Sequence, residues 1–148
     1  MRKRPIGVWL ASLYALYKTL IYLSGTVLLF GVVHFWPEAL PEAGQILMES
    51  MTPFVALLAW ANLFAMLAAG IALFRLKRLA APLFLTTAGL TLASSLHGYF
   101  TQPELVELAA EASPLPFYLG TLIGTAIPLG IAFYCFRLTK KGVLGTDA

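Results

Sequence analysis

His34 and His97 are the only histidines of this 148-residue chain, and each stands six or seven residues before a Pro-Glu pair. Two imidazoles at one depth could bind a haem iron from both sides, or a divalent cation with help from Glu38 and Glu104. No basic residue stands near them to pair with haem propionates, and neither belongs to a compact zinc motif. We therefore expect no cofactor, with haem or a divalent metal as the alternative.

A second group of candidate residues is polar but uncharged, within long apolar stretches. Asn62 is about 13 Å from the start of its stretch at 1.5 Å per helical residue, at a depth where an unpaired amide is costly. We expect it to form a hydrogen bond between helices, or to contact a solute or ion. The other candidates are hydroxyl side chains along one side of the next stretch and a proline that bends the last one: Thr87, Thr91, Ser94, Ser95 and Pro128.

No catalytic motif accompanies these residues. The sequence contains no Gly-rich phosphate loop, Cys-x-x-Cys, His-Glu-x-x-His or Gly-x-Ser-x-Gly. No acidic residue lies within an apolar stretch to act as a proton relay. The single cysteine, Cys135, has no partner for a disulfide, and we interpret it as a small buried apolar residue. We do not expect an enzyme.

The elements that carry these residues follow from an apolar composition. Hydrophobic residues make up 59% of the chain and charged residues 11%, and the mean hydropathy is +0.82. Soluble domains average about 25% charged residues, so this chain cannot cover a water-facing surface. The composition predicts an integral membrane protein, and it excludes a disordered chain and a disulfide-stapled secreted domain.

Apolar stretches long enough to cross a bilayer predict a single all-α transmembrane domain, a bundle of four transmembrane helices. They cover residues 19–36, 53–74, 79–97 and 116–136. Residues 6–17 precede the first span, and we expect them to lie at the interface or to extend that helix. Lys18 snorkels at the boundary if the span begins at Thr19, and lies deep if the helix begins at Ile6. We favour the boundary position.

Basic residues flank these spans on one side only. They precede the first span, join the second to the third and follow the fourth, whereas the two remaining loops hold glutamates and no Lys or Arg. By the positive-inside rule both termini are cytoplasmic, in a multi-pass protein of the inner (plasma) membrane. The pI of 9.2 reflects this segregation, so we expect no nucleic-acid partner. The expected partners are the lipid bilayer and other membrane proteins or a second copy.

The two acidic loops resemble each other, which suggests an internal repeat. Each begins with Pro-Glu, places polar residues three and seven positions after that Glu, and re-enters the membrane at Pro-Phe. Because this spacing puts the polar residues on one helical face, we expect short amphipathic interfacial helices. A duplicated hairpin predicts parallel-repeat halves over residues 6–78 and 79–141. It also predicts that the two histidines turn the same way.

Small residues mark the faces on which helices meet in lipid. They are Ala61, Ala65 and Ala69 in the second span, and Gly120 and Gly124 in the fourth. The leading hypothesis is therefore a non-enzymatic accessory, assembly or scaffold component that acts through helix-helix association. The alternative is a small dimeric transporter or channel, with Asn62 and the hydroxyl side chains on its path and outer glutamates attracting cations. A second alternative is a membrane subunit with His-ligated haem or metal.

Overall fold

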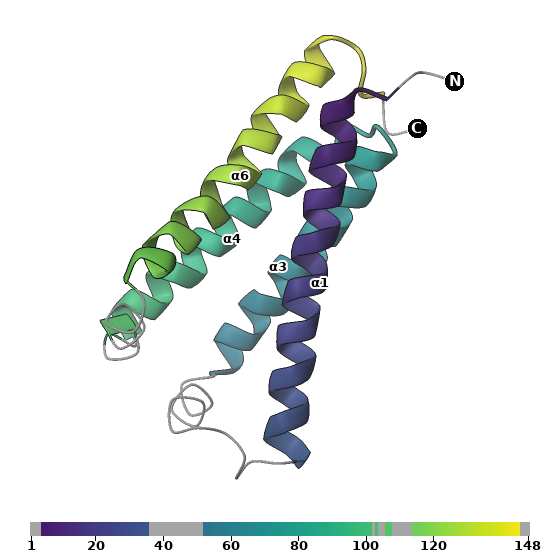
Figure 1. Cartoon of the computed structure of the whole chain (residues 1–148). Coiled ribbons are helices and arrows are strands. Elements are labelled where there is room, and N and C mark those ends of the chain that lie inside the picture. The colour runs from purple at the N-terminus through teal and green to yellow at the C-terminus, as the bar shows by residue number, and fades with distance from the viewer. Residues whose placement is uncertain (1–3, 36–51, 102, 104–105, 108–113, 146–148) are drawn as a thin grey trace.

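The computed structural model describes residues 4–35, 52–101, 103, 106–107 and 114–145. For residues 28–34 and 114–118 it describes the backbone and not the side chains. These residues form an all-helical bundle (Figure 1). Its helices are α1 (Ile6–Phe35), α3 (Pro53–Phe74), α4 (Ala80–Thr101) and α6 (Pro114–Lys140). Three segments are long and apolar enough to cross a membrane: Ile6–Val27, Pro53–Phe74 and Leu119–Lys140. The predicted helical membrane protein is confirmed at this level.

Helix α4 has the length of a membrane span, but unlike the other three helices it contains no segment apolar enough to be a candidate span. It has 22 residues, as does α3. Its threonines, serines, glycines and histidine lower its apolar content, and it is not among the candidate spans. Because α4 packs against both α3 and α6, it is an integral part of the bundle. That its predicted span, residues 79–97, crosses the membrane stays a prediction.

Helix α1 is continuous from Ile6, so its start differs from the favoured span beginning at Thr19. Val8, Ala11 and Ala15 are buried in the core of the bundle. This small apolar face precedes Lys18 and packs the first half of α1 inside the bundle, so residues 6–17 extend the helix. Lys18 lies within the apolar segment Ile6–Val27, and its depth relative to the membrane boundary stays a prediction.

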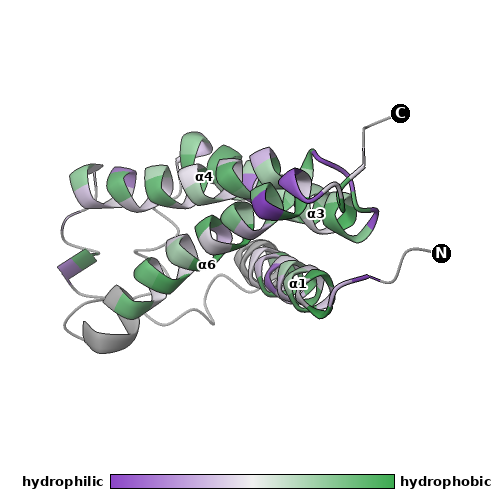
Figure 2. Ribbon diagram, turned by 90° about the horizontal axis from the view of Figure 1, so that it is seen from above, coloured by the Kyte–Doolittle hydropathy of each residue, from purple (hydrophilic) through white to green (hydrophobic). Residues whose placement is uncertain are grey.

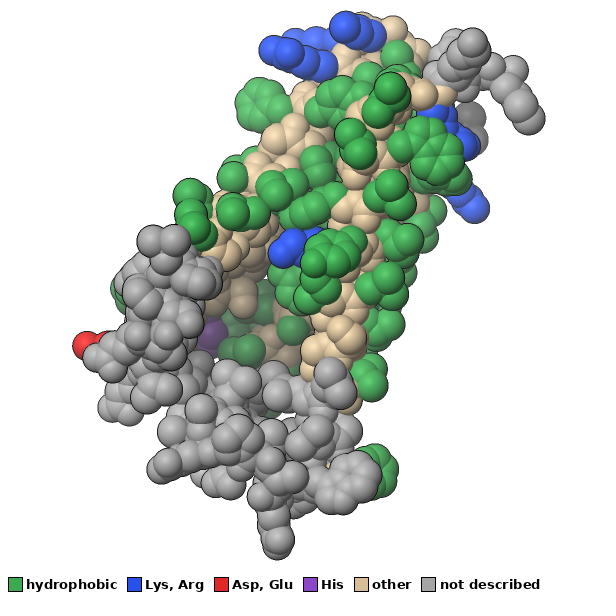
Figure 3. Space-filling model, viewed as in Figure 1, with side chains coloured by type: hydrophobic (Ala, Val, Ile, Leu, Met, Phe, Trp, Pro, Cys, Tyr) green, Lys and Arg blue, Asp and Glu red, His purple; other side chains and the backbone are tan. Residues whose placement is uncertain are grey.

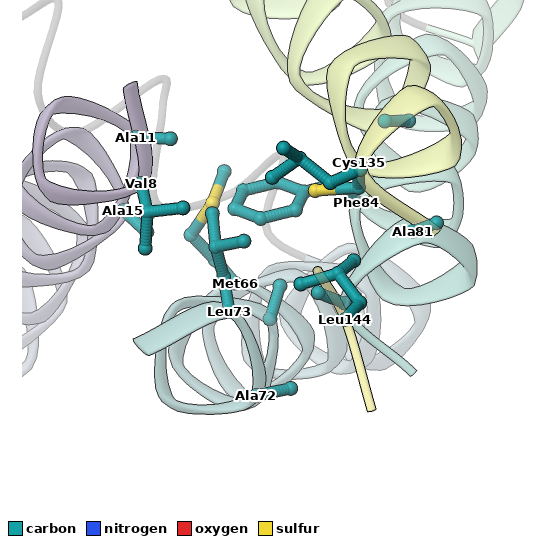
Figure 4. Close-up of a cluster of buried hydrophobic side chains, with 14 residues drawn as sticks. Val8, Ala11, Ala15, Met66, Ala72, Leu73, Ala81, Phe84, Cys135 and Leu144 are labelled. Atoms are coloured by element: carbon teal, nitrogen blue, oxygen red, sulfur yellow. The ribbon is translucent and has the colours of Figure 1, made fainter. Parts of the chain in front are cut away.

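The hydrophobic core lies toward the end of the bundle where both termini are found. Phe84 of α4 is fully buried, and Met66, Leu73 and Cys135 surround it (Figure 4). Leu144, beyond the end of α6, joins the same cluster with 1% of its surface exposed. The segment after α6 therefore folds back and seals this end of the core.

The same backbone motif ends α3 and α6. The Lys77 N–H donates to the Ala72 carbonyl at 2.8 Å, and the Val143 N–H donates to the Leu138 carbonyl at 3.0 Å. The residue before each donor has a positive φ, 57° at Leu76 and 66° at Gly142. This is the Schellman cap, which satisfies the last carbonyls of a helix and favours glycine at the left-handed position.

The helices pack in sequence order, α1 on α3, α3 on α4 and α4 on α6. Helices α1 and α6 converge at the end that holds the termini and diverge toward the other end (Figure 1). At the convergent end, a Cβ added to Gly7 would lie 2.5 Å from the hydroxyl oxygen of Tyr134, so the Tyr134 side chain packs directly against the α1 backbone there. The bundle is therefore open on one side, between α1 and α6.

Charge is segregated along the bundle. The helices are mostly hydrophobic in Figure 2, and the basic side chains in Figure 3 gather mainly at the end where the termini lie. The described basic residues near that end are Arg4, Arg75, Lys77, Arg78, Arg137, Lys140 and Lys141. The side of the membrane on which this end lies stays a prediction. The predicted interfacial helices fall largely on residues outside the described ones, and the repeat stays a prediction.

Candidate functional site

Asn62 is the polar side chain that the bundle encloses near the middle of α3. Only 7% of its surface is exposed. Its amide nitrogen donates to the Thr91 hydroxyl at 3.1 Å, which joins α3 to α4. Its amide oxygen is buried and has no hydrogen-bond partner among the described residues. A buried polar atom left unpaired costs about 1–3 kcal/mol. Among the described residues, the fold therefore satisfies the nitrogen of this amide but not its oxygen.

Thr91 of α4 lies where residues of the other three helices come together. Its hydroxyl donates to the Thr87 carbonyl at 2.9 Å and accepts from Asn62. The side chain of Tyr22, from α1, lies close enough to interact with the Thr91 side chain. On α6, a Cβ added to Gly124 would lie 3.8 Å from the Thr91 methyl carbon. Residues distant in sequence are thus gathered around one threonine.

The other hydroxyl side chains of α4 differ in their surroundings. Thr87 is fully buried and donates to the Phe84 carbonyl at 2.8 Å. Ser95 is half-buried and donates to the Thr91 carbonyl at 3.0 Å. Ser94 lies on the same side of α4 by helical spacing but is exposed. The hydroxyl groups at 87, 91 and 95 therefore form a ladder bonded to their own helix, and Ser94 lies outside it.

A polar stripe on α1 faces the opening of the bundle. Tyr14, Lys18 and Tyr22 follow one another at intervals of four residues, on one helical face. Tyr14 and Gly7 line a groove of about 370 Å³ with Ile127, Gly130 and Tyr134 among the α6 residues. The Tyr14 hydroxyl is buried and has no hydrogen-bond partner in the described part of the chain.

Sequence reasoning missed Tyr14 and Tyr22 as site residues because aromatic side chains near a span start suit a membrane interface. The signal that identifies them is their shared spacing with Lys18. Lys18 itself is half-buried, one turn from each tyrosine. Since Lys18 lies within the apolar segment Ile6–Val27 and one turn from two polar side chains, we include it in the candidate site.

Pro128 adds a backbone acceptor to this region. It is fully buried inside α6. Because proline has no N–H, the carbonyl four residues earlier loses its helical donor. That carbonyl belongs to Gly124, which lies beside Thr91. The unpaired amide oxygen of Asn62 and a carbonyl that lacks its usual helical donor therefore both belong to residues that neighbour Thr91.

The histidine hypothesis finds no support in the described residues. The His97 ring lies edge-on to Phe54 with centroids 4.9 Å apart, and its Nε2 is buried without a partner among those residues. The side chains of His34, Glu38 and Glu104 fall outside the described residues. Among the described residues, no three His, Cys, Asp or Glu side chains lie close enough together to hold a metal ion.

The small residues of α3 serve packing within the chain. Ala69 is fully buried, and Ala61 and Ala65 are half-buried. A Cβ added to Gly70 would lie 2.9 Å from the Cβ of Ala15, so α1 and α3 approach closely there. Gly120 of α6, in contrast, meets no atom within 4 Å. The alanine face of α3 is therefore largely used inside the bundle.

Comparisons with known proteins do not indicate a function for this chain. No family model matches the chain, and no curated protein or solved structure matches it. The function is therefore inferred from the geometry of the residues described above.

Proposed function

We propose that this protein is a small transporter or channel for a polar solute that carries hydrogen-bond donors, with Asn62 and Thr91 on its path. The observation that carries this proposal is the buried, unpaired amide oxygen of Asn62. In lipid, no water is present to satisfy such an atom, so a purely structural residue gains nothing from leaving it free. A solute with N–H or O–H groups supplies the missing donor.

The chemistry around Asn62 favours a neutral solute. Pro128 cannot donate to the Gly124 carbonyl, so that carbonyl is a second candidate acceptor, and Gly124 neighbours Thr91. Lys18 places a positive charge on the facing stripe of α1, which opposes a metal cation. Among the described residues the only acidic side chain is Glu107, beyond α4. Small polyols and amides fit these requirements better than cations, which we expected the outer glutamates to attract.

The open side of the bundle supports a dimeric transporter. The groove between α1 and α6 holds Tyr14, and the stripe that contains Tyr14 continues to Lys18 and Tyr22. Figure 3 shows a hollow on this side. A second copy placed against α1 and α6 encloses these polar groups, which four helices of one chain leave open. In this proposal α4 crosses the membrane and both termini are cytoplasmic, as the grouping of basic residues at one end supports.

The accessory or scaffold role ranks second. It depends on small-residue faces that bind a partner helix, and the alanine face of α3 is largely covered by the chain itself. One observation favours this role: no described atom lies within 4 Å of a Cβ added to Gly120, so a partner helix could approach α6 there.

Solute flux tests the proposal. Proteoliposomes with the purified protein are mixed with hyperosmotic glycerol or urea, and light scattering reports solute entry. We expect faster entry than in empty liposomes, and loss of that entry in Asn62→Leu and Thr91→Val. Thr86→Val is the matched control, because Thr86 is exposed on α4 and bonds only its own helix. Entry of neither solute into liposomes of the folded wild-type protein, or equal entry in all variants, contradicts the proposal.

A further inference from the structure

A groove between α1 and α3, distinct from the candidate site, lies toward the end of the bundle that holds the termini. It encloses about 520 Å³, within the size range of ligand pockets. Its lining includes Trp9, Ser12, Leu16, Leu67, Ile71 and Phe74. From Leu67 to Arg75 the groove extends about 12 Å along α3, at 1.5 Å per residue. It is therefore an elongated and mostly apolar groove along the helix pair.

Two arginines stand at the mouth of this groove. Arg75 lines it directly. The guanidinium carbon of Arg4 lies 4.2 Å from the ring centroid of Phe74 and 5.8 Å from that of Trp9. The two rings themselves are packed edge-to-face, with centroids 5.3 Å apart. This aromatic pair holds Arg4 beside the apolar groove by cation-π attraction.

Neither arginine is neutralised by the described part of the chain. Both are exposed, and the one acidic residue in that part, Glu107, follows α4 at the opposite end of the bundle. The groove thus combines an apolar channel with two positive charges at its mouth that no described residue compensates. An anionic amphiphile matches both features.

We propose that this groove binds one acyl chain of an anionic phospholipid, whose phosphate lies between Arg4 and Arg75. The other plausible occupant of an apolar groove, a peptide segment, needs donors and acceptors for its backbone. The groove offers few polar groups, among them the hydroxyl of Ser12, which is buried and unpaired among the described residues. An acyl chain has no such need. This inference is independent of the proposed transport function.

Quenching of Trp9 fluorescence by brominated lipid tests this site. Trp36→Phe and Trp60→Phe leave Trp9, which lines the groove, as the sole tryptophan. The protein in neutral maltoside micelles is titrated with phosphatidylglycerol or phosphatidylcholine brominated at mid-chain. Two arginines at the headgroup predict half-quenching at about 30-fold less phosphatidylglycerol than phosphatidylcholine.

Two sets of variants separate the groove from general surface charge. Arg4→Gln with Arg75→Gln is expected to remove most of this preference. Arg137→Gln with Lys140→Gln, which removes equal charge from the end of α6 at the same end of the bundle, is expected to retain it. Ser12→Leu fills the groove while removing an unpaired hydroxyl, so it should weaken quenching by both lipids and leave the protein folded. Equal half-quenching by the two lipids, an equal effect of the α6 pair, or no effect of Ser12→Leu overturns the proposal.

Discussion

The amide nitrogen of Asn62 donates a hydrogen bond to the Thr91 hydroxyl 3.1 Å away, while the amide oxygen of the same residue is buried without a partner. Hydrogen bonds between transmembrane helices contribute about 0.6–2 kcal/mol. A buried acceptor left unpaired costs about 1–3 kcal/mol. The two terms nearly cancel, so stability alone gives little reason for an asparagine at this position.

This balance predicts the stability of Asn62→Leu. The substitution loses the bond to Thr91 and also removes the unpaired oxygen, so the free energy of unfolding should change by less than about 1 kcal/mol. Thr91 keeps its bond to the Thr87 carbonyl. Thermal unfolding in mild detergent measures the change. A loss of several kcal/mol identifies Asn62 as a structural residue and removes the argument for a solute contact.

The contact between α1 and α6 predicts a clash in Gly7→Ala. The added Cβ would lie 2.5 Å from the Tyr134 hydroxyl oxygen and 2.7 Å from the adjoining ring carbon, so either the Tyr134 side chain must move out of its place or the helices must separate. Overpacking of this kind costs about 1–3 kcal/mol. Gly130→Ala is the matched control, because Gly130 lines the same groove and meets no atom within 4 Å. Equal unfolding temperatures of the two variants disprove the close approach.

The cap of α6 predicts opposite signs for two glycine substitutions. Gly142 has a φ of 66° in open space, so Gly142→Ala should cost about 1 kcal/mol through the backbone alone. Gly89, inside α4 and also in open space, has an ordinary helical conformation. Gly89→Ala should instead stabilise the protein by about 0.5–1 kcal/mol. Chemical denaturation of both variants measures the difference, and a stabilising Gly142→Ala contradicts the assigned cap.

The bounds of α3 agree with the span predicted from hydropathy, because local signals mark both ends of this helix. The Thr52 side chain accepts a hydrogen bond from the Val55 N–H, proline begins the helix, and Arg75 ends it. The first span was harder to delimit, because α1 continues from Ile6 past Lys18. A hydropathy window responds to the charge of Lys18, whereas packing of Val8 and Ala15 against the bundle depends on contacts between helices. Likewise, α6 continues beyond Phe136 to Lys140, because a helix need not end where its apolar residues do.

The candidate site was predictable in part. Asn62 and Thr91 are conspicuous as polar residues in apolar stretches, and the structure brings them together. That Ser94 is exposed and Thr87 buried follows from how far the neighbouring helices extend, which sequence spacing does not state. The contribution of Tyr22 depends on the approach of α1 to α4, for which the sequence holds no local signal.

Reactivity of a cysteine at position 91 tests most directly whether a polar path reaches the Asn62–Thr91 pair. In a Cys135→Ala background, Thr91→Cys and Leu92→Cys place thiols at the same depth, the latter at a side chain that is 47% exposed. A charged, membrane-impermeant thiosulfonate is applied to proteoliposomes. If a polar path reaches this pair, the thiol of Thr91→Cys reacts, and glycerol or urea slows that reaction. The thiol of Leu92→Cys, which faces lipid, stays unmodified. Modification of Thr91→Cys no faster than Leu92→Cys contradicts a polar path and leaves Asn62 as a buried structural residue.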